Sequence, residues 1–444
     1  MLRSMVLLIP LLLVALVQAD DGQKANPKIQ PGEIPDLVKK LGDPSFQVRE
    51  SALKRLQNAD LDLLPALRKA LEEVEDADVQ RKLNDIVGNL ERNQYLSPTK
   101  VTLKIANLPV KEAIQKFSEA TGYQFEAASG DMGENKLIEL EFKDTLFWHA
   151  FEEFCNRAGL VFQEGYYGSN ADAIRLEYGD SFPGVVHVSG PFRVSVRGFN
   201  YTRNIEFASR SLRSADAPAS PIRRTESLTI RLGLTVEPKL PLLTCGQPII
   251  TEAFDDSGQP LTLPSQMQFF GARYYSGYRT FSQEVHANLQ PAPGSKAIKL
   301  LRGTIPVTVV ASQKPRIVIE KVMEAQGRTF EEGNVSLKIE NISKNGQQIT
   351  FRINLTDGAQ QGKRDYSWIN QLMQRLVLID AKGNKWQCYG PSWDGNGFNG
   401  GANFSGSITY ANNGKAGEPE RMVYYDWHIL SHSVPFEFQD LTLP

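Results

Sequence analysis

A short segment of this chain is repeated without gaps at a shift of 37 residues, and this duplication limits the fold more than any other feature. Residues 101–105 align with residues 138–142, and the same shift places Gly122 against Gly159. Each copy begins with an alternating strand, continues with an amphipathic helix and reaches a glycine that suits a left-handed helix end. The sequence therefore predicts a β-α-β unit that is made twice, with an edge strand added at residues 174–178.

The shift also holds at other positions of the duplicated segment. The further matched pairs are Asn107 and Asp144, Ala113 and Ala150, Phe117 and Phe154, and Phe125 and Phe162. We expect the short polar residues Asn107 and Asp144 near the two helix starts. The pattern of a strand, Asn107-Leu108-Pro109, a helix and Thr121-Gly122-Tyr123 resembles the short N-terminal domain shared by secretins and TonB-dependent receptors. The resemblance covers residues 99–180 and implies a non-catalytic periplasmic docking module. No secretin pore or receptor barrel follows, so the pore and transport roles do not carry over.

A second repeat, of helical period, precedes this module at residues 33–95. The apolar positions Ile34, Leu37 and Leu41 recur as Leu64, Leu67 and Leu71, and Phe46, Val48, Ala52 and Leu56 recur as Ala77, Val79, Leu83 and Val87. Asp43-Pro44 and Asp76 are expected to start the second helix of each unit. The segment resembles a pair of HEAT-like repeats, which usually present a surface to protein partners. A simple four-helix spacer is the alternative.

Beyond about residue 183 the helical period gives way to short strands separated by turn residues, which is typical of all-β sandwiches. A chain of 444 residues is also too long for one hydrophobic core. Three landmarks repeat in order: residues 193–196 parallel 316–319, residues 254–258 parallel 379–383, and residues 305–309 parallel 434–438. We therefore predict two tandem sandwiches at residues 183–312 and 313–444. The predicted fold class is multi-domain: HEAT-like helices, an α+β module of duplicated β-α-β units, then two all-β sandwiches.

The start of the chain has the features of a secretory signal peptide. Arg3 precedes an apolar run at residues 6–17, and Val17-Gln18-Ala19 fits a small-residue cleavage site. A membrane anchor would need ~20 apolar residues. We expect residues 1–19 to be removed and residues 20–32 to form a polar linker. The mature protein should be exported to the periplasm or the cell exterior, without a later membrane span.

Composition and motifs argue against several classes of function. A net charge of −2 gives no basis for binding nucleic acid. Cys155, Cys245 and Cys388 form no C-x-x-C motif, which disfavours a zinc ribbon, although a disulfide between Cys245 and Cys388 stays open. His428 and His432 lack a specified third ligand, so we expect no metal site and no cofactor. Nucleophile and phosphate-binding signatures are absent, and we predict that the protein is not an enzyme.

Two stretches rich in aromatic residues and glycine are the candidate binding elements, at residues 264–281 and 391–407. Both follow an Asp-x-x-Gly turn, and both begin with Pro-Ser. Long irregular loops are uncommon in compact domains unless they have a function, and aromatic side chains bind sugars or protein hot spots. The alternative is that they only cap or pack the sandwiches. The candidate binding residues are Phe269, Phe270, Tyr274, Tyr275, Tyr278, Trp393 and Phe398.

These features together predict a non-enzymatic exported scaffold or adaptor that mediates protein–protein interaction in the bacterial envelope. The helical repeats and the docking module would engage an envelope protein, while the sandwiches would present the aromatic loops. The combination resembles secreted bacterial multi-domain proteins. A carbohydrate-binding or hydrolase-accessory protein that uses the same loops for a glycan is the alternative.

Overall fold

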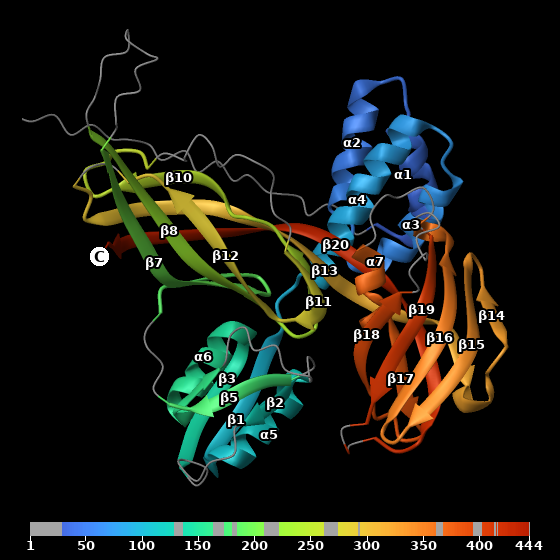
Figure 1. Cartoon of the computed structure of the whole chain (residues 1–444). Helices are drawn as coiled ribbons and strands as arrows, with labels where there is room; N and C mark the ends of the chain where they lie inside the picture. Colours follow the sequence, from blue (N-terminus) through green and yellow to red (C-terminus); the bar gives the residue numbers. More distant parts are fainter. Residues whose placement is uncertain are drawn as a thin grey trace, which may run out of the picture. The chain divides into compact units, whose positions relative to one another are not determined.

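The computed structural model begins with helices and continues into antiparallel β-sheets (Figure 1). The chain divides into two compact units, Met1–Gln94 and Tyr95–Pro444, which we describe separately. No helix in the described parts of the chain is long and apolar enough to cross a membrane. The structure describes residues 29–127, 136–162, 173–179, 184–207, 222–261, 274–291, 294–360, 367–393, 402–412, 414 and 416–443.

The first unit consists of helices that bury one apolar stripe each. Its elements are η1 (Pro31–Glu33), α1 (Ile34–Leu41), α2 (Phe46–Gln57), η2 (Leu61–Leu63), α3 (Leu64–Glu73) and α4 (Ala77–Tyr95), whose last residue belongs to the second unit. As predicted, Asp76 caps α4, because its Oδ1 accepts hydrogen bonds from the backbone N–H of Asp78 and of Val79 at 2.9 and 3.0 Å.

The start of α2 differs from the prediction. The helix begins at Phe46 after Ser45, so Pro44 lies before the helix, and the Asp43 carboxylate accepts a hydrogen bond from the Ser45 N–H at 2.8 Å. Phe46 was expected in the apolar stripe, yet it is 67% exposed. The stripe of α2 therefore rests on Ala52 and Leu56, which are both buried.

The second unit opens with a small α/β module at residues 95–178, in which both predicted β-α-β orders are present. The first copy is β1 (Lys100–Pro109), α5 (Val110–Thr121) and β2 (Gln124–Ala127); the second is β3 (Leu137–Leu146), α6 (Phe147–Ala158) and β4 (Leu160–Phe162). Strand β1 pairs antiparallel with β3, while the added β5 (Ala173–Tyr178) lies between β2 and β4. The equivalent residues Phe117 and Phe154 stack at 4.6 Å between ring centroids, so the two helices share one core.

The backbone of the two copies matches at its unusual positions. Gly122 and Gly159 end the helices with φ of 72° and 68°, in the left-handed conformation predicted for them. Asn107 and Asp144 also have positive φ, 51° and 50°, but they lie within β1 and β3, not at the helix starts. The residues that directly precede the helices are Pro109 and Leu146, so Asn107 and Asp144 lie near the helix starts, as expected, without being the N-cap residues.

Two sandwich-like pairs of antiparallel sheets follow the module. The first contains a four-stranded sheet in the order β12 (Ser282–Leu289), β8 (Ile222–Val236), β7 (Phe192–Phe207) and β6 (Val186–Ser189). A second sheet faces it across one hydrophobic cluster, which we call the first β core. That facing sheet contains β11 (Tyr274–Thr280), β9 (Leu242–Cys245), β13 (Ala297–Glu320), β20 (Pro419–Thr442) and β17 (Leu376–Asp380), with β10 (Ile249–Asp255) paired to β13.

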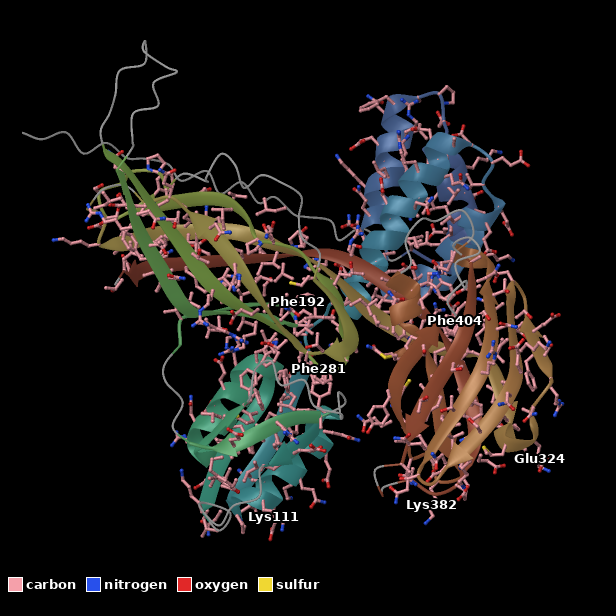
Figure 2. The ribbon with its side chains drawn as sticks, in the orientation of Figure 1. Lys111, Phe192, Phe281, Glu324, Lys382 and Phe404 are labelled. Atoms are coloured by element: carbon pink, nitrogen blue, oxygen red, sulfur yellow. The ribbon has the colours of Figure 1, made fainter. Side chains whose placement is uncertain are left out.

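The second β core lies between the far part of that facing sheet and a five-stranded sheet. Phe404 belongs to this core, whereas Phe192 belongs to the first (Figure 2). The five strands are, in order, β14 (Thr329–Glu332), β15 (Val335–Asn345), β16 (Gln348–Asp357), β19 (Asn403–Ala411) and β18 (Gln387–Trp393). The short elements around it are η3 (Val322–Glu324), η4 (Gly358–Gln360), α7 (Ser367–Asn370) and α8 (Leu372–Arg375).

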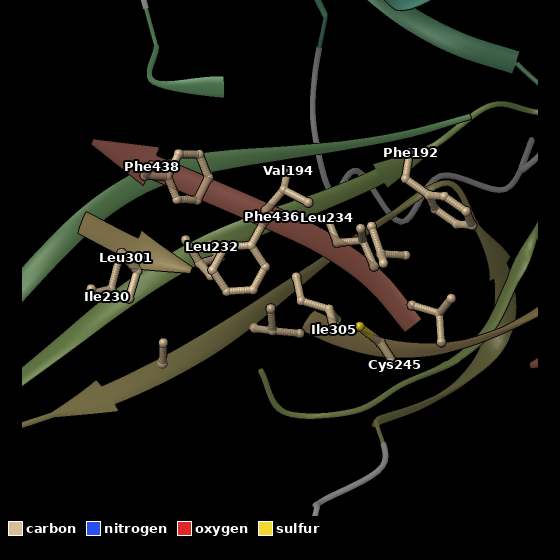
Figure 3. Close-up of a cluster of buried hydrophobic side chains, with 14 of the residues drawn as sticks. Phe192, Val194, Ile230, Leu232, Leu234, Cys245, Leu301, Ile305, Phe436 and Phe438 are labelled. Atoms are coloured by element: carbon tan, nitrogen blue, oxygen red, sulfur yellow. The ribbon is translucent and has the colours of Figure 1, made fainter. Parts of the chain in front are cut away.

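One long ribbon passes through both cores. Strands β13 and β20 each span 24 residues, and they pair from Ala297 opposite Thr442 to Glu320 opposite Arg421. The expected division between residues 312 and 313 therefore falls inside β13. Residues 434–438 were expected in the second sandwich, but Phe436 and Phe438 lie in the first β core (Figure 3). Alternation along a strand shows that a face is buried, but not against which partner strands.

Candidate functional site

Four of the seven predicted binding residues lie on strands, not in irregular loops. Strand β11 contains Tyr274, Tyr275 and Tyr278, and Trp393 ends β18. The structure describes only the backbone at these four positions. β11 pairs with β9, and β18 pairs with β19. Phe269, Phe270 and Phe398 lie outside the described residues.

A short helix brings the two aromatic stretches to one place. Helix α8 lies within contact distance of β11, β18 and β20, although β11 and β18 belong to different sheets. The approach to β18 depends on Gly390, which has a φ of 115°; a Cβ at this position would lie 2.9 Å from the sulfur of Met373. We call α8 with the adjoining parts of β11, β18 and β20 the α8 junction.

A buried ionic network fixes α8 against β20 and β16. Arg375, only 5% exposed, donates through Nε to the Tyr425 carbonyl at 3.0 Å and through Nη1 to the Asp357 carboxylate at 3.5 Å. The Tyr424 hydroxyl donates to the same Asp357 oxygen at 3.0 Å, and the Arg375 guanidinium lies 4.7 Å from the Tyr424 ring centroid. Burial raises the pKa of Tyr424 far above its usual range, so the phenol stays a neutral donor. The network is a rigid support for the junction.

The part of the junction on β20 combines apolar side chains with the half-exposed Asp426, whose carboxylate lies 3.6 Å from the Arg375 guanidinium. Trp427 is 8% exposed and packs with Leu243 and Val310 in a small cluster outside the two main cores. Its indole Nε1 is buried and has no hydrogen-bond partner among the described residues. Ile429, two residues further along the strand, is 42% exposed. Because the Trp427 donor is buried, it cannot reach an acceptor on a partner, and the apolar surface that this part of β20 offers is the Ile429 side chain.

A second polar cluster joins the α/β module to the first sandwich-like pair. Glu237 has no exposed surface, and its carboxylate accepts hydrogen bonds from the Thr99 hydroxyl at 2.6 Å and from the Tyr123 hydroxyl at 2.8 Å. The Trp148 indole also donates to the Pro191 carbonyl at 2.9 Å. Because the buried carboxylate is surrounded by donors, this joint holds the module in place.

Two acidic turns that the sequence matched at a shift of 125 make the same bonds in the structure. Asp255 accepts hydrogen bonds from the backbone N–H of Ser257 and Gln259, and Asp380 accepts them from those of Lys382 and Asn384. The pKa of Asp255 is lowered to about 2, and the largest cause is a hydrogen bond from the Ser295 hydroxyl. The pKa of Asp380 is also lowered to about 2, and the largest cause there is a hydrogen bond from the Gly417 N–H. Carboxylates held in this way stabilise turns and stay ionised at neutral pH, so they are poor general acids.

The histidines and cysteines do not assemble a reactive centre among the described residues. No group of three or more His, Cys, Asp or Glu side chains in these ranges could hold a metal ion. The His428 ring lies 5.4 Å from that of Tyr95, and the His432 ring stacks on Phe192 at 5.4 Å. Cys245 and Cys388 are free thiols, and burial raises their pKa to about 12 and about 11.

No sequence pattern pointed to Glu237, Asp357 or Arg375. Each lies at or just beyond the end of a strand or helix, where a charged residue is normally solvated. Their burial depends on segments far away in the sequence, such as Thr99 for Glu237. No family model, curated protein or solved structure matches the chain.

Proposed function

We propose that the chain is a non-enzymatic exported adaptor that mediates protein–protein contacts in the bacterial envelope. The proposal takes residues 1–19 as a signal peptide, residues 33–95 as HEAT-like repeats and residues 99–180 as a docking module like that of secretins and TonB-dependent receptors. The remaining residues form two sandwich domains that present a binding surface. The observation that supports this proposal most directly is the α8 junction, where strands from both sandwich-like pairs contact one helix.

The α8 junction supports a contact with a protein more than a chemical reaction. Its buried charges, Arg375 and Asp357, are paired with each other, and Tyr424 completes the network. The exposed Ile429 supplies apolar surface, and the half-exposed Asp426 supplies a carboxylate. Aromatic residues and arginine are the residue types enriched in protein interfaces.

Cross-linking of the tagged mature protein in intact cells, followed by mass spectrometry, tests this function. Tyr275→Ala and Trp393→Ala should each reduce recovery of the main partner at least tenfold, which corresponds to about 1.4 kcal/mol of binding energy. Tyr201→Ala is the matched control, because Tyr201 is an aromatic residue with 38% exposure on β7, which lies in a different sheet from both β11 and β18. Unchanged recovery with both junction variants would contradict the assignment of the junction as the partner site.

Carbohydrate binding is a second candidate, favoured by the three tyrosines of β11, which α8 contacts. A glycan array separates the two functions. A signal that depends on Tyr275 and Trp393, without recovery of a protein partner, would support the glycan function and reject the adaptor.

A further inference from the structure

The C-terminal part of β20 belongs to a core that is otherwise built from much earlier residues. Strand β20 first passes through the second β core, where Met422 and Tyr424 are fully buried. It then leaves that core and enters the first one. The residues of this closing segment, residues 430–443, that lie in the first β core are Leu430, Val434, Phe436, Phe438, Leu441 and Leu443.

One side chain of the closing segment, Phe436, packs closely against the backbone of β13 in the first β core. Phe436 is 1% exposed and lies opposite Gly303 of β13. A Cβ at Gly303 would lie 2.9 Å from Phe436 Cζ and 2.5 Å from the Ile249 carbonyl oxygen, so only glycine allows this approach. Without the closing segment, β13 would keep its pairing with β10 and β9 but lose its pairing with β20 along residues 297–309. The six core side chains of the closing segment would also be missing, so part of the apolar surface of β7 and β8 would face water.

We propose that the closing segment is a folding gate: strands β7, β8 and β12 reach their protected state only when residues 430–443 have paired with β13 and filled the first β core. The segment reaches the first core through the second, because residues 419–424 of the same strand pair with β17 and line the second core. Strand β13 has β-bulges at Val310/Ser312 and Pro315/Ile317 where the ribbon passes between the cores. Export of the chain rests on the proposed function. In an exported chain, the gate would keep the first sandwich-like pair from folding until the C-terminal residues have crossed the membrane.

Pulsed hydrogen exchange with mass spectrometry during refolding of the full chain tests the gate directly. Amides of β7 (residues 192–198) and β8 (residues 228–236) should gain protection in the same kinetic phase as amides of residues 430–442. Protection of β7 and β8 in an earlier phase than residues 430–442 would overturn the proposal. The measurement uses purified protein without a partner, so its outcome is independent of whether the adaptor function is correct.

Two substitutions on the same strand give a matched comparison in the native full chain. Phe436→Ala should speed exchange of protected β7 and β8 amides about a hundredfold or more, and leave β15 and β16 within about threefold of the original. Met422→Ala, at the second core, should have its larger effect on β15 and β16. An equal rise in both cores for Phe436→Ala, or no rise in β7 and β8, would reject the gate. If Phe436→Ala fails to fold, the refolding measurement on the unaltered chain still decides the question.

Discussion

Arg375 and Asp357 form an ion pair at 3.5 Å inside the second sandwich-like pair, with side-chain exposures of only 6% and 3%. Removing one partner of a buried pair leaves the other charge without compensation, at a cost of about 3–5 kcal/mol. We therefore expect Arg375→Met to lower the free energy of unfolding by about that amount in urea titrations.

Two further variants show whether the loss comes from the unpaired charge. The double variant Arg375→Met/Asp357→Leu should recover part of the stability, because no buried charge remains. Lys299→Met, at an exposed pair with Asp440 where both side chains are more than 60% exposed, should cost at most about 1 kcal/mol. A loss of less than about 1 kcal/mol for Arg375→Met would show that the pair is solvated.

The two acidic turns predict a specific acid dependence of stability. The pKa of Asp255 and of Asp380 is lowered in the folded state from 3.8 to about 2, so both contribute stability above pH 3.8. This contribution is lost as the pH falls from about 4 towards 2, because the unfolded chain then binds protons that the folded chain does not. Asp255→Asn should therefore reduce the loss of stability in this window, as measured by the urea midpoint against pH. Asp380→Asn should have a similar and additive effect; an unchanged pH dependence in the double variant would refute the assignment.

Local patterns predicted local structure well. The alternation at residues 101–105, the helix ends at Gly122 and Gly159 and the cap at Asp76 each depend on neighbours within a few residues. The repeated turns at Asp255 and Asp380 belong to the same class, because their bonds to the backbone N–H of Gln259 and Asn384 connect residues within four positions. Such features follow from backbone preferences that the sequence displays directly.

Features that depend on distant partners could not be predicted. The sequence equivalence of residues 305–309 and 434–438 indicated two matching strands in separate sandwiches. In the structure Ile305 and Val434 lie opposite each other as partners in one ribbon. A two-residue period in the sequence indicates that one face of a strand is buried, but it does not indicate which strand pairs with it. The α8 junction could not be predicted for the same reason, because β11 and β18, which both contact α8, are far apart along the chain.

The free thiols provide a test of how tightly the cores are closed. Burial raises the pKa of Cys245 from 9.0 to about 12, and Cys245 is 1% exposed. At pH 8 the thiolate population of Cys245 should be about a thousandfold lower than that of an ordinary cysteine. We expect negligible maleimide labelling of Cys245 in the native protein, and full labelling in urea, by peptide mass spectrometry. Cys388, with a pKa of about 11 and intermediate exposure, should react sooner than Cys245. Faster labelling of Cys245 than of Cys388 in the native state would contradict the closed first core.

The joint at Glu237 predicts how firmly the α/β module is attached. The Glu237 carboxylate has no exposed surface and accepts hydrogen bonds from the N–H and the hydroxyl of Thr99 and from Tyr123. Glu237→Gln keeps the shape but replaces one acceptor oxygen with an amide that faces donors, at a cost of about 2–3 kcal/mol. We therefore expect hydrogen exchange around Thr99 and in residues 191–195 to rise by about thirtyfold or more in this variant. Glu139→Gln, at an exposed position on β3 of the same module, should leave exchange at the joint unchanged. Equal exchange in both variants would mean that the carboxylate does not hold the module, and that the contact of Trp148 with Pro191 carries the attachment.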